Sequence, residues 1–163
     1  MKTQQNLYLK HTHHGARAPT HFDIFNHKWI VTGESTLVGQ RMLYLLGVHN
    51  KNIYGKYYNK TFNPNEFLIY STILNRTIMS INSQFNGWFP YENFEKINKN
   101  QTEKAIPHYL KSNIKIKNIV DQLDDNSIIN GVQVFPIHTL NENEENNINI
   151  ILIILNLWFN KGK

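Results

Sequence analysis

Two short apolar segments, each followed by a loop and then by a helical pattern, constrain the fold of this chain most strongly. Residues 7–11 partly alternate and residues 67–70 form a compact apolar run, as expected of strands. Thr36 is a suitable N-cap for a helix whose apolar residues, at 37–48, fall near helical spacing and are expected to form core. The pattern becomes helical again over residues 73–88. Strand, loop and helix in this repeated order predict an α/β fold with parallel strands.

The length and composition indicate one globular domain. The 163 residues suit a domain with a sizeable core, and 40% of them are hydrophobic. The formal net charge of +5 comes from scattered lysines and arginines rather than from a basic block, so no nucleic-acid partner is expected. Because the chain contains no cysteine, a disulfide framework and a thiolate metal site are excluded. No basic-then-apolar leader follows Met1, and the cell compartment and the oligomeric state are left open.

The most apolar stretch of the chain lies near its end, at residues 148–159 (INIILIILNLWF). It is shorter than the roughly 20 residues that a membrane-spanning helix needs, so we expect a buried strand or helix rather than a membrane anchor. An acidic, asparagine-rich segment, NENEENN, precedes it. We therefore expect a partial domain over residues 5–140 and an atypical tail over residues 141–163.

Each predicted strand leads into a loop that carries an arginine. The first loop contains His13, His14, Gly15 and Arg17, and in the second Arg76 lies at the start of the next helix. In α/β sheets ligands bind beyond the carboxyl ends of the strands, where both loops are expected to meet. Guanidinium groups match phosphate oxygens, glycine lets the backbone approach an anion, and a neutral imidazole is a good nucleophile toward phosphorus. The pattern predicts a phosphoryl-transfer pocket in which two arginines hold the anion over His14.

The first of these loops, HHGARAP, resembles the R-H-G-x-R-x-P signature of the histidine acid phosphatases, a branch of the phosphoglycerate mutase-like superfamily. Further stretches between residues 7 and 140 resemble motifs of the same family, in the same order. They are STLVGQR with LG after it (residues 35–41 and 46–47), YSTILNRTIMS (residues 70–80), GWFP (residues 87–90) and VFPIHT (residues 134–139). The resemblance implies a phosphoglycerate mutase-like fold, with a parallel sheet in three layers, of which this chain carries an incomplete, N-terminal part.

The resemblance also implies roles for the residues of the pocket. His14 would attack phosphorus and form a phosphohistidine, while Arg17 and Arg76 would bind the non-bridging oxygens and stabilise the transition state. His13 would be a substrate-binding residue at the position of the family's first arginine. The implied ligand is a phosphomonoester or inorganic phosphate, hydrolysed as acid phosphatases do, and no metal or cofactor is expected.

Two departures from the family pattern lower the activity expected of this chain. The imidazole of His13 lacks the guanidinium fork and is only partly charged near neutrality. The family's distal His-Asp pair, which protonates the leaving group, has no counterpart, because neither residue type occurs after His138. We therefore expect weak or absent turnover, with a non-catalytic phosphate-binding module or a non-functional fragment as the alternatives.

The histidines also allow a second interpretation, a zinc site, because His11, His13 and His14 lie close together in the sequence. Metallohydrolase clusters of this kind need an acidic residue after the second histidine, and Gly15 and Ala16 supply none. The phosphate pocket is therefore the favoured interpretation.

Overall fold

The computed structural model describes residues 4–20, 31–90, 96–128, 133–139 and 150–159. The chain divides into two compact units, which we call the sheet unit (residues 1–89 and 134–163) and the helical unit (residues 90–133). The elements in chain order are β1 (Gln4–His13), α1 (Leu37–Tyr54), β2 (Phe67–Ser71), α2 (Asn75–Trp88), α3 (Lys99–Thr102), a 3-10 helix (His108–Leu110), α4 (Ile114–Leu123), β3 (His138–Thr139) and β4 (Ile150–Phe159).

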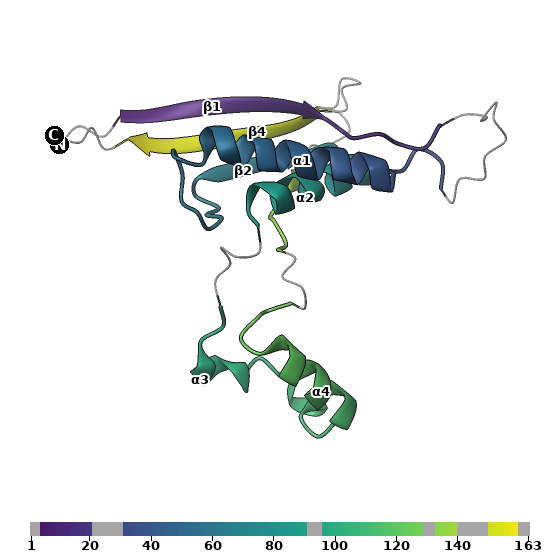
Figure 1. The fold of residues 1–163 in the computed structure, drawn as a ribbon, viewed down its shortest axis with the longest axis vertical. Helices are drawn as coiled ribbons and strands as arrows, with labels where there is room; N and C mark the ends of the chain where they lie inside the picture. The colour runs from purple at the N-terminus through teal and green to yellow at the C-terminus, as the bar shows by residue number, and fades with distance from the viewer. Residues whose placement is uncertain (1–3, 21–30, 91–95, 129–132, 140–149, 160–163) are drawn as a thin grey trace. The chain divides into compact units, whose positions relative to one another are not determined.

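The sheet has the strand order β1-β4-β2-β3, so strands from both ends of the chain lie side by side (Figure 1). β4 runs antiparallel to β1, from His13 opposite Ile150 to Gln4 opposite Phe159, and antiparallel to β2 as well. β3 is parallel to β2, so β1, β2 and β3 share one direction. The predicted α/β class is confirmed.

The sequence predicts a parallel sheet. In the structure the sheet is mixed, because β4 is antiparallel to both of its neighbours. Residues 140–149 are all that separate the end of β3 from the start of β4. A parallel strand requires a crossover connection of roughly a dozen residues or more, whereas a shorter connection returns the chain in the opposite direction. The length of this connection therefore accounts for the reversed strand.

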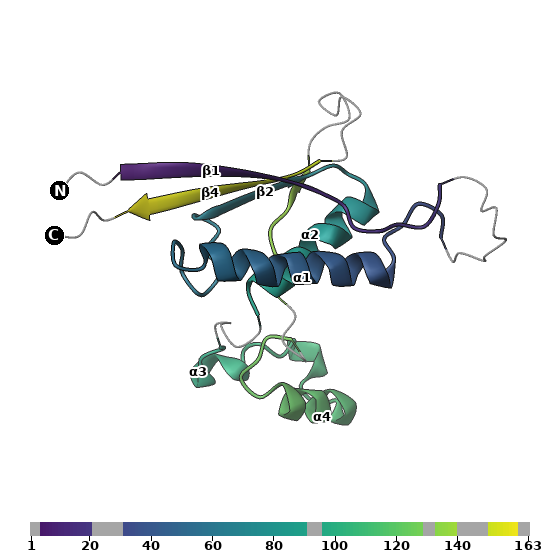
Figure 2. The same ribbon diagram turned by 45° about the horizontal axis from the view of Figure 1, so that its top comes forward.

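Helices α1 and α2 lie against each other on one face of the sheet (Figure 2). Thr36 is the N-cap of α1, as predicted, because its hydroxyl accepts a hydrogen bond from the Gly39 amide at 3.0 Å. The buried residues of α1 are Gly39, Leu43, Gly47 and Asn50, which recur at helical spacing. Small residues on this side let the helix approach its neighbours closely.

The expectation that the apolar residues of 37–48 form core is wrong for four of them. Leu37, Val38, Met42 and Leu45 are 82%, 65%, 53% and 58% exposed. The buried side of α1 is the side on which α2 approaches, and that approach requires glycine. The larger residues consequently lie on the remaining sides of the helix, so apolar content alone does not identify its core face.

Aromatic rings form the centre of the sheet unit. Phe67 of β2 lies edge-on to Phe85 and Trp88 of α2 and to Phe89, with ring centroids 5.0–5.9 Å apart. All four side chains are at most 2% exposed. Edge-to-face pairs at such distances stabilise a core beyond the effect of burial alone, so this cluster fixes α2 on the sheet.

The apolar stretch near the end of the chain forms β4, one of the two buried forms expected from the sequence. Ile153 lies opposite Ile69 of β2, and both side chains are fully buried. Within the described ranges, no helix has the length and apolar character needed to cross a membrane. The division into a partial domain (residues 5–140) and a tail (residues 141–163) stays a prediction, although β4 belongs to the same sheet as β1 and β2.

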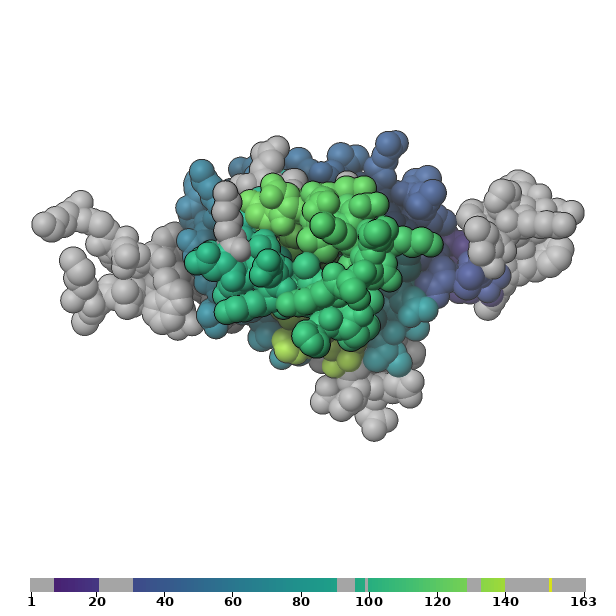
Figure 3. Space-filling model, turned by 90° about the horizontal axis from the view of Figure 1, so that it is seen from below, coloured from purple at the N-terminus to yellow at the C-terminus, as the bar shows by residue number. Residues whose placement is uncertain are grey.

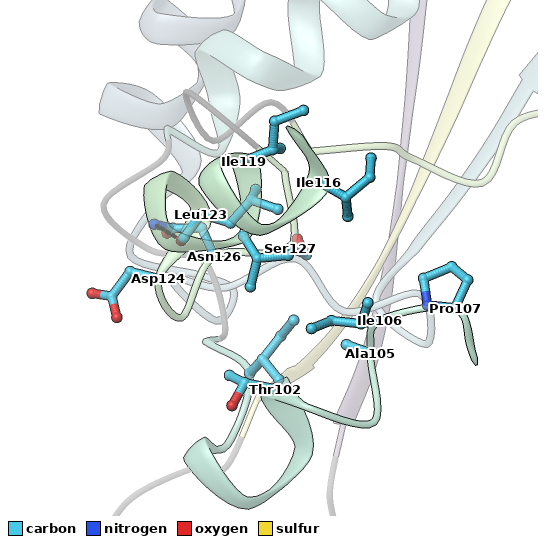
Figure 4. A pocket seen from close by; sticks show the side chains of 12 residues that line it. Thr102, Ala105, Ile106, Pro107, Ile116, Ile119, Leu123, Asp124, Asn126 and Ser127 are labelled. Atoms are coloured by element: carbon cyan, nitrogen blue, oxygen red, sulfur yellow. Dashed lines mark hydrogen bonds between the residues drawn. The ribbon is translucent and has the colours of Figure 1, made fainter. Parts of the chain in front are cut away.

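The helical unit, whose atoms are teal to green in Figure 3, contains α3, the 3-10 helix and α4. Asn113 caps α4 by accepting a hydrogen bond from the Lys115 amide at 3.0 Å. An apolar hollow of about 180 Å³ lies between α4 and the segment of residues 102–107 (Figure 4). Its lining residues include Ile106, Ile116 and Leu123, and none of them is a predicted phosphate-site residue.

Candidate active site

The predicted histidine loop leaves the end of β1 and packs against α1 backbone to backbone. A Cβ atom on Gly15 would meet the carbonyl oxygen of Gly39, and a Cβ atom on Gly39 would meet the carbonyl oxygen of Ala16. Glycine is therefore required at both positions for steric reasons. This contact places the loop beside the first turn of α1.

Hydrogen bonds from three segments hold the backbone of this loop. The Gly15 amide donates to the hydroxyl of Ser80 on α2 at 3.1 Å. The carbonyl of Ala16 accepts from both the hydroxyl and the amide of Thr36, at 2.9 and 3.1 Å. The Ala18 amide donates to the carbonyl of Glu34 at 2.8 Å. The loop is thus fixed by α1, by α2 and by the segment that precedes α1.

His14 is half-buried, and its ring is oriented by the backbone. Its Nδ1 atom lies 2.7 Å from the carbonyl oxygen of Gly15. Because a carbonyl oxygen only accepts hydrogen bonds, Nδ1 carries the proton in this arrangement. In the neutral ring the lone pair is then on Nε2. The geometry therefore favours the tautomer in which Nε2 can act as a nucleophile.

The surroundings of His14 favour its neutral form. Burial is the main cause that lowers the pKa of His14, and the hydrogen bond to Gly15 acts in the opposite direction. The positive charges of His13, Arg76 and Arg17, in decreasing order, lower the pKa further. These charges come from two loops, and the structure thus brings all four predicted site residues within electrostatic reach of one another.

His13 lies directly against His14. The two ring centroids are 4.0 Å apart and the ring planes are inclined by 44°. Nδ1 of His13 lies 3.1 Å from the carbonyl oxygen of His14, so the ring of His13 is also oriented by a backbone carbonyl. Its side chain is exposed, unlike that of His14. His13 therefore lies on the solvent side of the histidine pair.

The two arginines come from separate segments, as the sequence predicts. Arg17 pairs with Ser35 in an isolated β-bridge, and its Nη1 atom donates to the carbonyl of Ala18 at 3.1 Å. Arg76 is the second residue of α2 and is half-buried. The N-terminus of a helix attracts an anion, and so does a guanidinium group. The first turn of α2 and the charge of Arg76 would therefore both attract an anion.

Two residues of this region were not predicted from the sequence. Ser80 occurs within the motif-like stretch of residues 70–80, yet nothing in the sequence indicates that it binds the Gly15 amide 65 positions away. Glu34 accepts a hydrogen bond from the side chain of Asn75 at 3.1 Å, which places a carboxylate beside the first turn of α2. Neither contact has a local sequence signal, because each joins segments that meet only in the folded chain.

The histidines of β1 do not form a zinc cluster in the structure. Among the described residues, no three His, Cys, Asp or Glu side chains come together in the way that a metal ion needs. His11 lies on β1 two residues before His13 and is exposed. The described residues whose charges act on His14 are His13, Arg76 and Arg17.

No protein-family model matches the chain. Its sequence is 32% identical over 99 residues to the lysosomal acid phosphatase of Xenopus laevis, a match that covers 58% of this chain and 23% of that protein. Among solved structures it is similar to the phytase of Citrobacter braakii, with a TM-score of 0.44 and 17% identity, over 73% of this chain and 38% of the phytase. The chain thus spans about a quarter of the curated relative's length. This sequence similarity to an acid phosphatase agrees with the resemblance of the ordered motifs in residues 7–140 to those of the histidine acid phosphatases.

Proposed function

We propose that the site binds phosphomonoesters or inorganic phosphate and that Nε2 of His14 attacks phosphorus. The observation that carries this proposal is the hydrogen bond between Nδ1 of His14 and the carbonyl of Gly15, at 2.7 Å. It leaves the lone pair of the neutral ring on Nε2. Arg17 and Arg76, whose charges act on His14, would bind the phosphoryl oxygens.

In the proposed reaction one displacement is divided into two steps. A bond forms between Nε2 of His14 and phosphorus while the bond from phosphorus to the leaving oxygen breaks. Water then attacks the phosphohistidine, the phosphorus–nitrogen bond breaks, and inorganic phosphate and neutral His14 are formed. The arginines stabilise the charge on the non-bridging oxygens in both steps.

The protonation state of His14 determines the pH at which this chemistry operates. Because the pKa of His14 is lowered, chiefly by burial, the ring stays neutral at a more acidic pH than an exposed histidine would. The nucleophile is therefore available at mildly acidic pH, as hydrolysis of the acid phosphatase type requires. The arginines remain charged throughout this range.

The leaving group decides how much turnover we expect. Arginines do not release protons at these pH values, so they cannot act as general acids toward an alkoxide leaving group. General acid catalysis typically contributes about 100- to 10,000-fold. We therefore expect aryl phosphates, whose phenolate leaves without protonation, to be hydrolysed slowly and alkyl phosphates more slowly still.

The test is hydrolysis of p-nitrophenyl phosphate near pH 5 by the chain and by His14→Ala. We expect the activity to disappear in the variant and a phosphohistidine to be detected only with His14 present. His11→Ala is the matched control, because His11 is an exposed histidine on β1, three residues before His14. An unchanged rate in His14→Ala would show that His14 is not the nucleophile.

A second candidate function is phosphate binding without turnover. It is favoured by the position of β4, which places Ile150 opposite His13 in the sheet, and by the absence of histidine and aspartate from residues 139–163. This part of the chain consequently brings neither an imidazole nor an aspartate to the site. Thermal stabilisation by inorganic phosphate that depends on Arg17 and Arg76, with no release of p-nitrophenol, would identify this function.

A further inference from the structure

We propose that Ser80 is a positioning residue for His14: its hydroxyl group holds the peptide that joins His14 to Gly15, so that the His14 ring stays against the Gly15 carbonyl and keeps its proton on Nδ1. The consequence for catalysis rests on the proposed function, whereas the effect on the tautomer does not. Ser80 would not touch the substrate. It acts through the backbone of the loop.

The backbone of Gly15 joins the two side chains. Its amide group donates to Oγ of Ser80 at 3.1 Å, and its carbonyl group lies 2.7 Å from Nδ1 of His14. Ser80 is fully buried on α2, and Gly15 is buried in the loop. The two groups of Gly15 are therefore held at once, the amide by a helix and the carbonyl by the ring of His14.

Steric packing alone does not fix the orientation of the amide and carbonyl groups of Gly15. Gly15 lies against the backbone of Gly39 on α1, and the missing Cβ leaves the glycine free to rotate about both of its backbone bonds. A buried amide without a partner costs free energy, so loss of the hydroxyl favours rotation of the peptide toward another acceptor or water. The rotating peptide joins His14 to Gly15 and so lies between the His14 ring and the Gly15 carbonyl, and its rotation changes the position of that carbonyl relative to Nδ1 of His14.

The same hydrogen bond relates the nucleophile to one of the arginines. Arg76 and Ser80 are four residues apart on α2, and residues at this spacing lie on one face of a helix. The helix that carries Arg76 is thus bound to the loop of His14 through Ser80. We therefore infer that the separation between the nucleophile and this phosphate-binding group depends on the Ser80 hydroxyl.

The experiment follows the His14 ring directly, by nitrogen-15 NMR of the chain labelled at its histidines. In the unaltered chain we expect neutral His14 to be mainly the Nδ1–H tautomer. In Ser80→Ala we expect the two tautomers to be comparably populated, and formation of the phosphohistidine to slow about tenfold, as for loss of one neutral hydrogen bond. Ser80→Thr keeps a hydroxyl and is expected to restore the tautomer.

Ser83→Ala is the matched control. Ser83 lies on the same helix, and its hydroxyl donates to the carbonyl of Met79, within α2, at 2.9 Å. It is expected to leave the His14 tautomer unchanged. If Ser80→Ala does not give a cooperative melt, Ser80→Cys replaces it, because a thiol of similar size is a weaker acceptor and gives the same change of smaller extent.

The outcomes separate this proposal from the proposed function. An unchanged tautomer in a folded Ser80→Ala or Ser80→Cys variant would overturn the role of Ser80, even if activity fell. A shifted tautomer in that variant supports the role. If the unaltered chain showed the Nδ1–H tautomer but never formed a phosphohistidine, the proposed function would fail while the role of Ser80 would stand.

Discussion

Gly47 of α1 lies against the carbonyl oxygen of Gln84 on α2, so closely that the two helices touch backbone to backbone. Gly87 of α2 makes the reciprocal contact with the carbonyl oxygen of Tyr44 on α1. Two glycines on facing helices therefore determine how near the helices can come. Because α2 carries Arg76 and Ser80 and α1 supports Gly15, this crossing also fixes the dimensions of the candidate site.

We expect Gly47→Ala to destabilise the chain by about 2 kcal/mol, even though alanine favours helices more than glycine does. The added Cβ meets main-chain atoms of α2, which cannot move away as a flexible side chain could. The free energy of unfolding in urea is the measurement. Asn52→Ala, at an exposed position of the same helix, is the control and is expected to be neutral or slightly stabilising. Equal effects of both changes would show that the helices do not pack through Gly47.

Tyr58 is expected to make the sheet unit sensitive to alkali. Burial raises the pKa of Tyr58 to about 12. Its hydroxyl accepts a hydrogen bond from the indole of Trp88 at 2.5 Å, and this bond lowers the pKa by less than burial raises it. An unfolded tyrosine ionises near pH 10, so stability is complete below that pH and is lost as the pH rises toward 12.

Absorbance titration of tyrosinate, together with urea unfolding at pH 8 and pH 11, tests this expectation. Tyr58→Phe removes the late-titrating group and leaves the buried Trp88 indole without this acceptor, which costs about 1–3 kcal/mol at pH 8. Tyr109→Phe, at a residue that is 82% exposed, is the control. A Tyr58 that ionises near pH 10 would contradict the burial of its hydroxyl group.

Local features of the sequence predict much of the fold. The hydroxyl of Thr36 before an apolar periodic segment predicts the start of α1, and the run at residues 67–70 predicts β2. Arg76 occurs at the beginning of α2, as expected. Each of these features depends on residues within one or two turns of each other, where capping and hydrophobic periodicity operate.

Long-range contacts could not be predicted in this way. The place of β4 between β1 and β2 depends on long-range pairing, because the paired residues of β1 and β4 are 137–155 positions apart and those of β2 and β4 are 80–88 apart. The bond between Gly15 and Ser80, and that between Glu34 and Asn75, join loops to α2 without any local pattern. The buried side of α1 contains Gly47, which meets α2, and Gly39, which meets Ala16 of the histidine loop. Hydrophobic periodicity does not identify such glycine contacts.

His14 is expected to make the stability of the chain depend on pH in the acidic range. Its pKa is lowered in the folded chain, chiefly by burial, relative to about 6.5 in the unfolded chain. Between these two values the unfolded chain binds more protons, so acidification favours unfolding. The stability that neutral His14 contributes is thus present above pH 6.5 and lost as the pH falls through the lower, folded value.

Urea unfolding between pH 7 and pH 5 measures this dependence. His14→Gln is expected to flatten it, whereas His11→Gln, at an exposed position of β1, is expected to leave it unchanged. The same slope in the chain and in His14→Gln would mean that the pKa of His14 is not lowered by folding.

His13→Arg is expected to increase the affinity for inorganic phosphate, most clearly at neutral pH. The ring of His13 lies 4.0 Å from that of His14, so a side chain at this position reaches an anion bound at the nucleophile. A guanidinium group stays charged at pH 7 and offers paired donors to phosphate oxygens, which an imidazole ring cannot do. A gain of about tenfold in affinity corresponds to one additional charge-assisted hydrogen bond.

Titration calorimetry at pH 5 and pH 7 measures this gain in phosphate affinity. His11→Arg is the control, because it adds the same charge two residues earlier on β1. Equal gains in both variants would assign the effect to net charge alone, and a gain specific to His13→Arg places that side chain at the phosphate.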